Sequence, residues 1–268
     1  MKVTKAVIPA AGMGTRMSPL TPAVPKELLP VGQLPMISYA ISEAAAAGID
    51  DIFIIIHKEK EAIRQFCSQT LWHNENLHLQ FVYQSNPLGV MDAIFRVRDA
   101  IQGEPFLLLM PDNVYFDATS SVENLLNVFE EYRQSVLALI EVKEETKELF
   151  SNSGNVDVRE IKNDLFRITG LKDKTRDTFH LTRTASGLRA CGRALLTGGF
   201  FDFADEIETD ILQNKDEVPV LQKMVQHGKV LGVRLKGRLF DCGHWQGYGA
   251  ANEFCRLNNS QHDEAANY

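Results

Sequence analysis

Glycines followed by an arginine near the N-terminus have the residue types and spacing for binding a phosphate group. In the segment 10–16 (AAGMGTR), Gly12 and Gly14 let backbone N–H groups approach an anion without a Cβ in the way. Arg16 adds a permanently charged guanidinium two residues later. A lone Gly-x-Gly is more often a tight turn, and the dinucleotide pattern GxGxxG is incomplete because residue 17 is Met.

A second cation and two carboxylates extend this chemistry. Lys26 lies in the segment 25–30 (PKELLP), which we expect its prolines to hold in an extended conformation. Asp112 directly follows the apolar run 106–110 (FLLLM), and Asp241 follows Phe240. Each aspartate alone is equally well interpreted as a turn residue. From the residues alone, both interpretations of the two aspartates, as ligands or as turn residues, stay open.

The elements needed to position these residues are strands that alternate with helices. In the first half, this alternation predicts βαβ units and a parallel sheet covered on both faces, with ligands bound at the carboxyl ends of the strands. Gly12 and Asp112 both follow predicted strands and therefore share that edge. The second half is less regular. Strands are predicted at 3–9, 52–56, 77–83, 106–110, 136–142, 151–157, 166–170 and 230–235, and helices at 36–48, 59–69 and 90–101.

The predicted fold class is therefore α/β, with a mixed, mainly parallel sheet flanked by helices. We expect a single domain over residues 1–257, with a regular first half at about 1–135 and a less regular second half at about 136–257. Residues 258–268 form a polar tail.

Composition excludes several classes of function. Among 268 residues, 44% are hydrophobic and 24% are charged, which is ordinary for a folded globular protein. The net charge of −7 argues against nucleic-acid binding, because no excess of cations exists to displace phosphate counterions. The apolar runs are much shorter than the roughly 20 residues that span a bilayer. The four cysteines show no CxxC pairing, so we expect reduced thiols, no zinc site and a cytoplasmic location.

The compound pattern of GxGTR and PKELLP resembles the sugar nucleotidyltransferases, also called NDP-sugar pyrophosphorylases. The segments YQSNPLGVMDAI, FLLLMPDN, GNVDV, ITGLKDK and LFDCGHWQGY follow in the order of that family. Within it, the chain is most similar to bacterial enzymes that join UTP and glucose 1-phosphate. The resemblance implies a Rossmann-like fold of the nucleotide-diphospho-sugar transferase type, and a Mg²⁺-dependent attack on the α-phosphate that releases pyrophosphate. It implies that the half at about 1–135 binds the nucleotide and that the half at about 136–257 binds the sugar phosphate. It also implies a homo-oligomer, either a dimer or a tetramer.

The resemblance assigns roles to individual residues by their place in these motifs. The implied transfer reaction needs no general base, because it depends on the positioning of the reactants and on charge neutralisation. The implied residues are Arg16, Lys26 and Asp112 for catalysis, Asp112 and Asp241 for Mg²⁺, Ala10, Ala11, Gly12, Gly14, Thr15, Gln84 and Gly89 for the nucleotide, and Gly154, Asp173 and Lys174 for the sugar phosphate.

Departures from the family pattern fall mostly on the sugar side. Asp173 stands where the family usually has a glutamate, and the segment 217–222 (EVPVLQ) loses the acidic end of its counterpart. Met91 and Asp92 replace a small residue and a histidine that are common there. Two alternatives therefore stay open. One is the same chemistry with dTTP or another hexose 1-phosphate, and the other is a non-catalytic regulatory paralogue that binds a nucleotide sugar.

Overall fold

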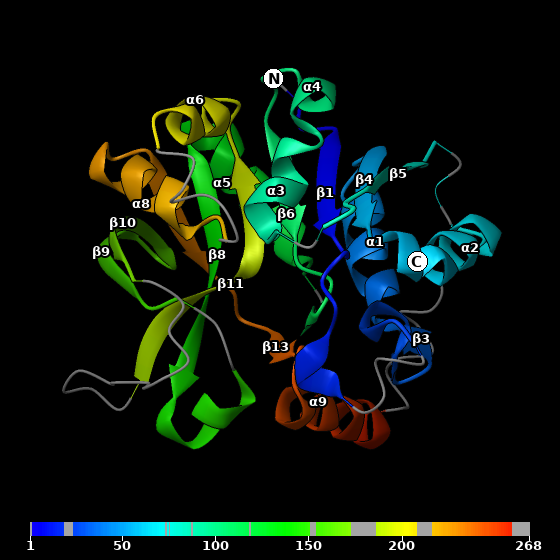
Figure 1. Ribbon diagram of the computed structural model, residues 1–268. Coiled ribbons are helices and arrows are strands. Elements are labelled where there is room, and N and C mark those ends of the chain that lie inside the picture. Colours follow the sequence, from blue (N-terminus) through cyan, green and yellow to red (C-terminus); the bar gives the residue numbers. More distant parts are fainter. Residues whose placement is uncertain are drawn as a thin grey trace.

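A nine-stranded sheet runs through the computed structural model, which describes residues 2–18, 24–72, 74, 76–86, 88–117, 119–150, 154–172, 186–207 and 216–258. Its strand order is β5-β4-β1-β6-β11-β8-β12-β10-β9, so that strands from both halves of the chain share one sheet (Figure 1). The strands are β1 (Lys5–Pro9), β4 (Asp51–Ile56), β5 (His78–Tyr83), β6 (Phe106–Leu109), β8 (Ser135–Lys143), β9 (Val156–Lys162), β10 (Leu165–Leu171), β11 (Ser186–Leu196) and β12 (Val230–Arg234).

The sheet is mixed but mainly parallel, as the sequence predicts. Strands β5, β4, β1 and β6 pair in parallel, and so do β8 and β12. Only β10 and β11 are reversed, because each pairs antiparallel with both of its neighbours. The central strands β4 and β6 are continuous apolar runs, and that composition is typical of parallel strands covered on both faces.

Strand β11 lies in the middle of the sheet, between β6 and β8, although the sequence pattern did not predict it. Its sequence, SGLRACGRALL, contains two glycines and two arginines that interrupt the apolar alternation. The pairing register with β8 shifts between Ala190 and Ala194, and Gly192 within this irregularity has a φ of 61°. Between these two pairs, β11 advances by four residues and β8 by two, so β11 carries two extra residues in a bulge that interrupts the regular pairing.

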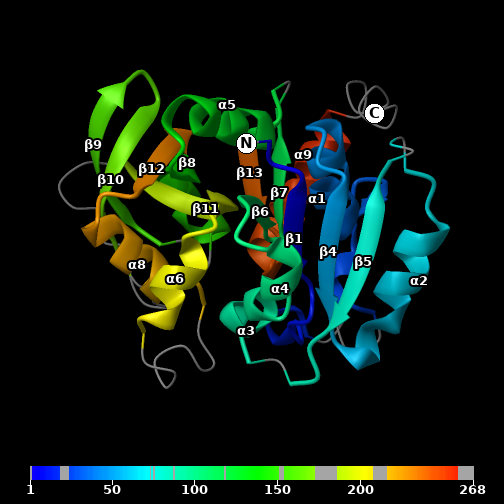
Figure 2. The same cartoon turned by 90° about the horizontal axis from the view of Figure 1, so that it is seen from above.

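Helices cover both faces of the sheet (Figure 2). One apolar core includes side chains of α1, α2 and α5, and a second core on the other face includes side chains of α3, α4, α6 and α8. The pattern at 90–101 forms two short helices rather than one, because Val97 leaves helical geometry with a φ of −109°. The bounds are α1 (Met36–Ala46), α2 (Glu61–Gln69), α3 (Val90–Phe95), α4 (Arg98–Ile101), α5 (Ser121–Tyr132), α6 (Phe200–Asp205), α8 (Val218–Gln226) and α9 (Trp245–Leu257).

A third apolar cluster supports two small sheets beside the large one. In the first, β7 (Asn113–Phe116) pairs antiparallel with β13 (Arg238–Asp241), and α9 packs against β13. In the second, β2 (Pro30–Val31) pairs with β3 (Leu34–Pro35). The β7–β13 register sets Asp241 opposite Asn113 and so brings the end of β13 to the end of β6. Within the described ranges, no helix is both long and apolar enough to cross a membrane.

Candidate active site

A cleft of about 330 Å³ opens at the carboxyl ends of β1 and β6. Pro9, at the end of β1, and Asp112, shortly after β6, both lie on its wall. The expectation that the glycine-rich segment and Asp112 meet at one edge of the sheet is therefore confirmed. Side chains from the second half of the chain close the other side, among them Phe150, Ala190 and Glu217.

The glycine-rich loop is anchored at both ends and open towards the cleft. Gly14 has a φ of 66°, which favours glycine, and it precedes the 3-10 turn η1 (Thr15–Met17). Met17 donates its backbone N–H to the Gly14 carbonyl at 2.9 Å, and its side chain is fully buried. Arg16 extends from this anchored turn onto the cleft wall. A Cβ on Gly12 would meet no protein atom within 4 Å, so the loop surface there faces open space.

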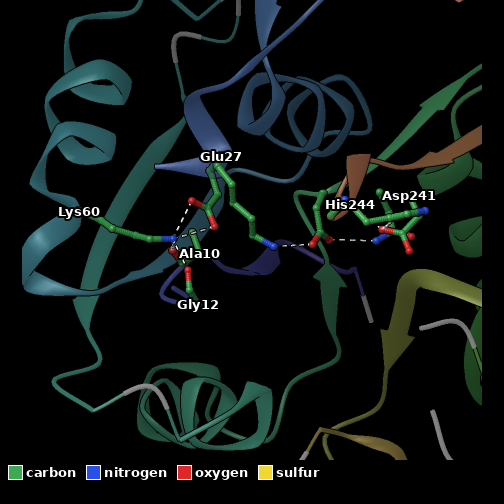
Figure 3. A network of polar contacts seen from close by, with 10 residues as sticks. Ala10, Gly12, Glu27, Lys60, Asp241 and His244 are labelled. Atoms are coloured by element: carbon green, nitrogen blue, oxygen red, sulfur yellow. Dashed lines mark hydrogen bonds and ion pairs between the residues drawn. The ribbon is translucent and has the colours of Figure 1, made fainter. Parts of the chain in front are cut away.

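A buried lysine, Lys60, binds the backbone of the same loop (Figure 3). The Lys60 ammonium donates to the Ala10 carbonyl at 3.0 Å and to the Gly12 carbonyl. It also contacts both carboxylate oxygens of Glu27, at 3.0 and 2.8 Å. Burial lowers the pKa of Lys60, although the Glu27 carboxylate acts in the opposite direction. The loop backbone is therefore tied, through Lys60, to the segment that carries Lys26.

Lys26 points the other way from its neighbour Glu27, towards the end of β6. Its ammonium lies 2.5 Å from Asp112 Oδ2. The segment is a 3-10 turn, η2 (Lys26–Leu28), in which the Leu28 N–H donates to the Pro25 carbonyl at 2.9 Å. The expectation of an extended segment was wrong, because Pro25 precedes the turn and leaves its hydrogen bonds intact.

The Lys26–Asp112 pair is charged in spite of its burial. Burial alone lowers the pKa of Lys26, but attraction to Asp112 and Glu27 outweighs it and raises the pKa above its ordinary value. Burial likewise raises the pKa of Asp112, and Lys26 reverses this effect so that the pKa is lowered. Asp241 also acts to raise the pKa of Asp112, as expected for two carboxylates that repel each other at close range.

A small space beside Gly243 is bounded by both carboxylates and by the arginine. A Cβ on Gly243 would lie 2.8 Å from Asp112 Oδ2, 3.0 Å from Asp241 Oδ1 and 3.4 Å from Arg16 Nη2. The two oxygens are therefore within about 6 Å of each other. The Gly243 N–H donates to Asp241 Oδ1 at 3.0 Å, which orients that carboxylate. Glycine at this position therefore allows both carboxylates to approach the backbone this closely.

Asp112 is held from the side by the β11 bulge. Asn113 Nδ2 donates to Asp112 Oδ1 at 3.0 Å. The Asn113 carbonyl in turn accepts from Arg193 Nη1 at 2.6 Å, and Arg193 forms two further bonds to Glu43 Oε2 at 3.0 and 2.8 Å. A Cβ on Gly192 would lie 2.9 Å from Asn113 Cγ, so only glycine leaves Asn113 in this place.

At the far end of the cleft, Gln84 follows β5 and is nearly buried. Its backbone N–H donates to the Ile56 carbonyl at 2.9 Å. Its side-chain Nε2 donates to the Gly89 carbonyl at 3.0 Å and to Asp92 Oδ2 at 2.7 Å. The cleft thus carries an amide at one end and a concentration of charge at the other.

Comparison with known proteins identifies the family. The model of the nucleotidyl transferase family matches residues 5–258. This chain belongs to the nucleotidyl transferase family. A protein of Pseudomonas aeruginosa named UTP–glucose-1-phosphate uridylyltransferase is 30% identical over 96% of this chain and 97% of its own length. A protein of Bacillus subtilis with the same name is 27% identical over 92% of this chain and 89% of its own.

Solved structures share the nucleotidyl transferase fold. A UDP-glucose pyrophosphorylase in complex with UDP-glucose superposes with a TM-score of 0.82 at 24% identity, covering 96% of this chain and 100% of that one. A UTP-bound enzyme of Acinetobacter baumannii gives a TM-score of 0.78 at 23% identity, covering 96% of this chain and 94% of that one. At these identities the likeness shows a common fold.

The structure brings most of the predicted nucleotidyl transferase residues to one cleft, but not all of them. Ala10 is fully buried, and its carbonyl faces Lys60 rather than the cleft. Gly14, Thr15 and Gly154 are not part of the cleft wall, and Asp173 and Lys174 lie outside the described residues. The predicted residues that line the cleft are Ala11, Gly12, Arg16, Lys26, Gln84, Gly89, Asp112 and Asp241.

Sequence reasoning missed the residues that hold these groups in place. Lys60 lies in the run 57–61 (HKEKE), which is typical of a solvated surface, yet its side chain is 7% exposed. Arg193 and Glu43 are 150 positions apart in the chain. The signal in the sequence that could have revealed Arg193 is the pair of arginines in an otherwise largely apolar stretch at 186–196, since an arginine in a central strand requires a buried partner.

Proposed function

We propose that this chain transfers the uridylyl group of UTP to the phosphate of glucose 1-phosphate, giving UDP-glucose and pyrophosphate. Membership of the nucleotidyl transferase family supports the reaction class, and the names of the relatives support this pair of substrates. The observation that carries the proposal is the meeting of Arg16, Lys26, Asp112 and Asp241 at one end of a cleft whose other end presents the Gln84 amide.

The reaction needs charge neutralisation more than proton transfer. An oxygen of the sugar phosphate attacks the α-phosphorus of UTP, one P–O bond forms, and the bond to the pyrophosphate oxygen breaks. No proton has to move, so the reaction itself requires no nucleophile–base pair. Arg16, on the anchored turn, and Lys26, oriented by Asp112, lie where they can neutralise the triphosphate and the developing charge.

The two aspartates fit a magnesium ion. Asp112 Oδ2 and Asp241 Oδ1 lie close to each other beside Gly243, both residues line the cleft, and the repulsion between the carboxylates decreases when a cation lies near both. The described residues contain no group of three or more His, Cys, Asp or Glu side chains suited to a metal. A pair of carboxylates is enough for Mg²⁺, because proteins bind this ion with one or two carboxylates together with substrate phosphates and water. When bound, it supplies charge neutralisation and orientation of the phosphate oxygens.

The substrates would occupy opposite sides of this centre. We assign the nucleotide to Ala11 and Gly12 of the loop and to Gln84 and Gly89, which all line the cleft, with the base at the Gln84 end. Gly154, Asp173 and Lys174 remain our proposed contacts to the sugar phosphate. The cytoplasmic location, the homo-oligomeric assembly and the single-domain organisation of residues 1–257 also stay predictions.

Pyrophosphate release from a panel of nucleoside triphosphates and sugar 1-phosphates tests the proposal. We expect turnover with UTP and glucose 1-phosphate in the presence of Mg²⁺, and very little with ATP or GTP. Preferred use of dTTP or of another hexose 1-phosphate would change the substrates but keep the chemistry. Tight binding of UDP-glucose without turnover of any pair would instead favour a regulatory paralogue.

A further inference from the structure

The amide of Gln84 is held in one orientation by two acceptors. Its Nε2 lies 3.0 Å from the Gly89 carbonyl oxygen and 2.7 Å from Asp92 Oδ2. A carbonyl and a carboxylate can only accept hydrogen bonds, so the NH₂ end of the amide must face them. Both amide hydrogens are then engaged within the protein. Since Gln84 lines the cleft, its carbonyl oxygen Oε1 is the polar atom left for a ligand.

Asp92 is itself held in place by Arg96. Arg96 Nε donates to Asp92 Oδ2 at 2.9 Å, and Nη2 donates to Oδ1 at 3.3 Å. Arg96 Nη1 also donates to the Tyr83 carbonyl at 3.2 Å, which ties α3 to the end of β5 directly before Gln84. A two-point contact of this kind orients a carboxylate better than a single bond does. Asp92 therefore presents Oδ2 to the amide in a stable position.

We propose that Asp92 determines the choice of pyrimidine by holding the Gln84 carbonyl oxygen towards the base. This inference rests on the proposed function, because it needs a nucleotide base at this end of the cleft. An acceptor at Oε1 pairs with an N–H group, and uracil and thymine carry one at N3. Neutral cytosine has a lone pair at N3 instead, which would face the lone pairs of Oε1. Asp92 acts through Gln84 and is a positioning residue.

The orientation matters because a glutamine whose amide can rotate would bind uracil and cytosine equally well. If the amide could turn, its NH₂ group would donate to cytosine N3 as readily as Oε1 accepts from uracil N3–H. A nearly buried site with one fixed polarity leaves the wrong base with unpaired groups, and such sites discriminate strongly. Loss of Asp92 leaves only the Gly89 carbonyl to hold the amide, and it also frees the Arg96 guanidinium as a competing donor.

Asp92→Leu, which keeps the approximate size of the side chain but removes both acceptor oxygens, tests this inference, with UTP, CTP and 5-methyl-UTP as probes. The last of these keeps the N3–H edge of uracil. For the wild-type protein we expect kcat/KM to favour UTP over CTP by about a hundredfold or more. In Asp92→Leu that ratio should fall by about tenfold or more, mainly through KM, while the ratio of UTP to 5-methyl-UTP stays unchanged. A general structural defect would lower all three values together.

Two further variants complete the experiment. Asp92→Ala removes the acceptor but favours the helix, so it provides a second folded variant in which the UTP:CTP ratio should also fall. Asp99→Leu, on an exposed position of α4, is the matched control and should keep the wild-type ratio. An unchanged ratio in both Asp92 variants would overturn the inference, and so would wild-type protein that binds CTP as tightly as UTP. Calorimetric affinities answer the same question without turnover, so failure of the proposed function is seen separately.

Discussion

At the scale of single residues, Asp112 and Asp241 test the mechanism most directly. Asp112→Asn and Asp241→Asn keep the side-chain size but remove a negative charge that we assign to Mg²⁺. Each change should lower kcat by about a hundredfold or more, leave the circular dichroism spectrum unchanged and weaken the dependence of rate on Mg²⁺. The double variant should lose little more than the worse single one, because both groups act on one ion. Near-normal, Mg²⁺-dependent turnover in either single variant would contradict the paired-ligand model.

The buried Lys60–Glu27 pair gives a second prediction at this scale. Lys60→Met leaves Glu27 without its cationic partner in a site where the Glu27 side chain is 0% exposed. We expect the free energy of unfolding in urea to fall by about 3–5 kcal/mol, and KM for UTP to rise because the Ala10 and Gly12 carbonyls lose a donor.

Two control variants separate the effect of Lys60→Met on stability from its effect on the position of the loop. The double variant Lys60→Met/Glu27→Leu should recover most of the stability but not the affinity for UTP. Glu61→Gln breaks the exposed ion pair with Arg64 and should leave both values unchanged. Full recovery of KM in the double variant would mean that Lys60 has no role in shaping the loop.

At the scale of elements, the bulge in β11 connects strand geometry to the active site. Gly192→Ala would place a Cβ 2.9 Å from Asn113 Cγ and so displace the residue that orients Asp112. We expect kcat to fall by about tenfold or more. Gly48→Ala is the matched control, since Gly48 also has a positive φ, of 74°, but a Cβ there would meet nothing within 4 Å. It should cost about 1 kcal/mol of stability and leave kcat unchanged. Equal kcat in both variants would argue against a link from β11 to Asp112.

The same strand shows how far sequence patterns predict elements. Continuous apolar runs predicted β4 and β6 nearly to the residue, because a strand buried on both faces has one pattern only. β11 was missed because Arg189 and Arg193 look incompatible with a central strand until partners such as Glu43 are known. Asp241 reaches Asp112 through the pairing of β13 with β7 and not through the large sheet, and strand pairing is not visible in local sequence.

At the scale of the whole molecule, the reactivity of the buried cysteine thiols measures how readily the whole fold opens. All four thiols are free and buried, and burial raises their pKa values, for Cys67 and Cys191 to about 12. Raised pKa values leave little thiolate at pH 8, and thiolate is the form that reacts with disulfide reagents. The four cysteines are divided between two apolar clusters, with Cys67 and Cys191 in one and Cys242 and Cys255 in the other. Their reaction therefore requires more than a local fluctuation of one loop.

The final prediction follows from this arrangement. Native protein at pH 8 should react negligibly with an aromatic disulfide over minutes, and all four thiols should titrate in guanidinium chloride. UTP with Mg²⁺ at about 100 times its Kd should slow the native reaction about a hundredfold, because a ligand bound only to the folded state stabilises it by about 2.7 kcal/mol. Cys242 is the most informative thiol, since it lies between Asp241 and Gly243. Rapid labelling of Cys242 in native protein, unaffected by UTP, would show that the β13 end of the cleft opens independently of the nucleotide.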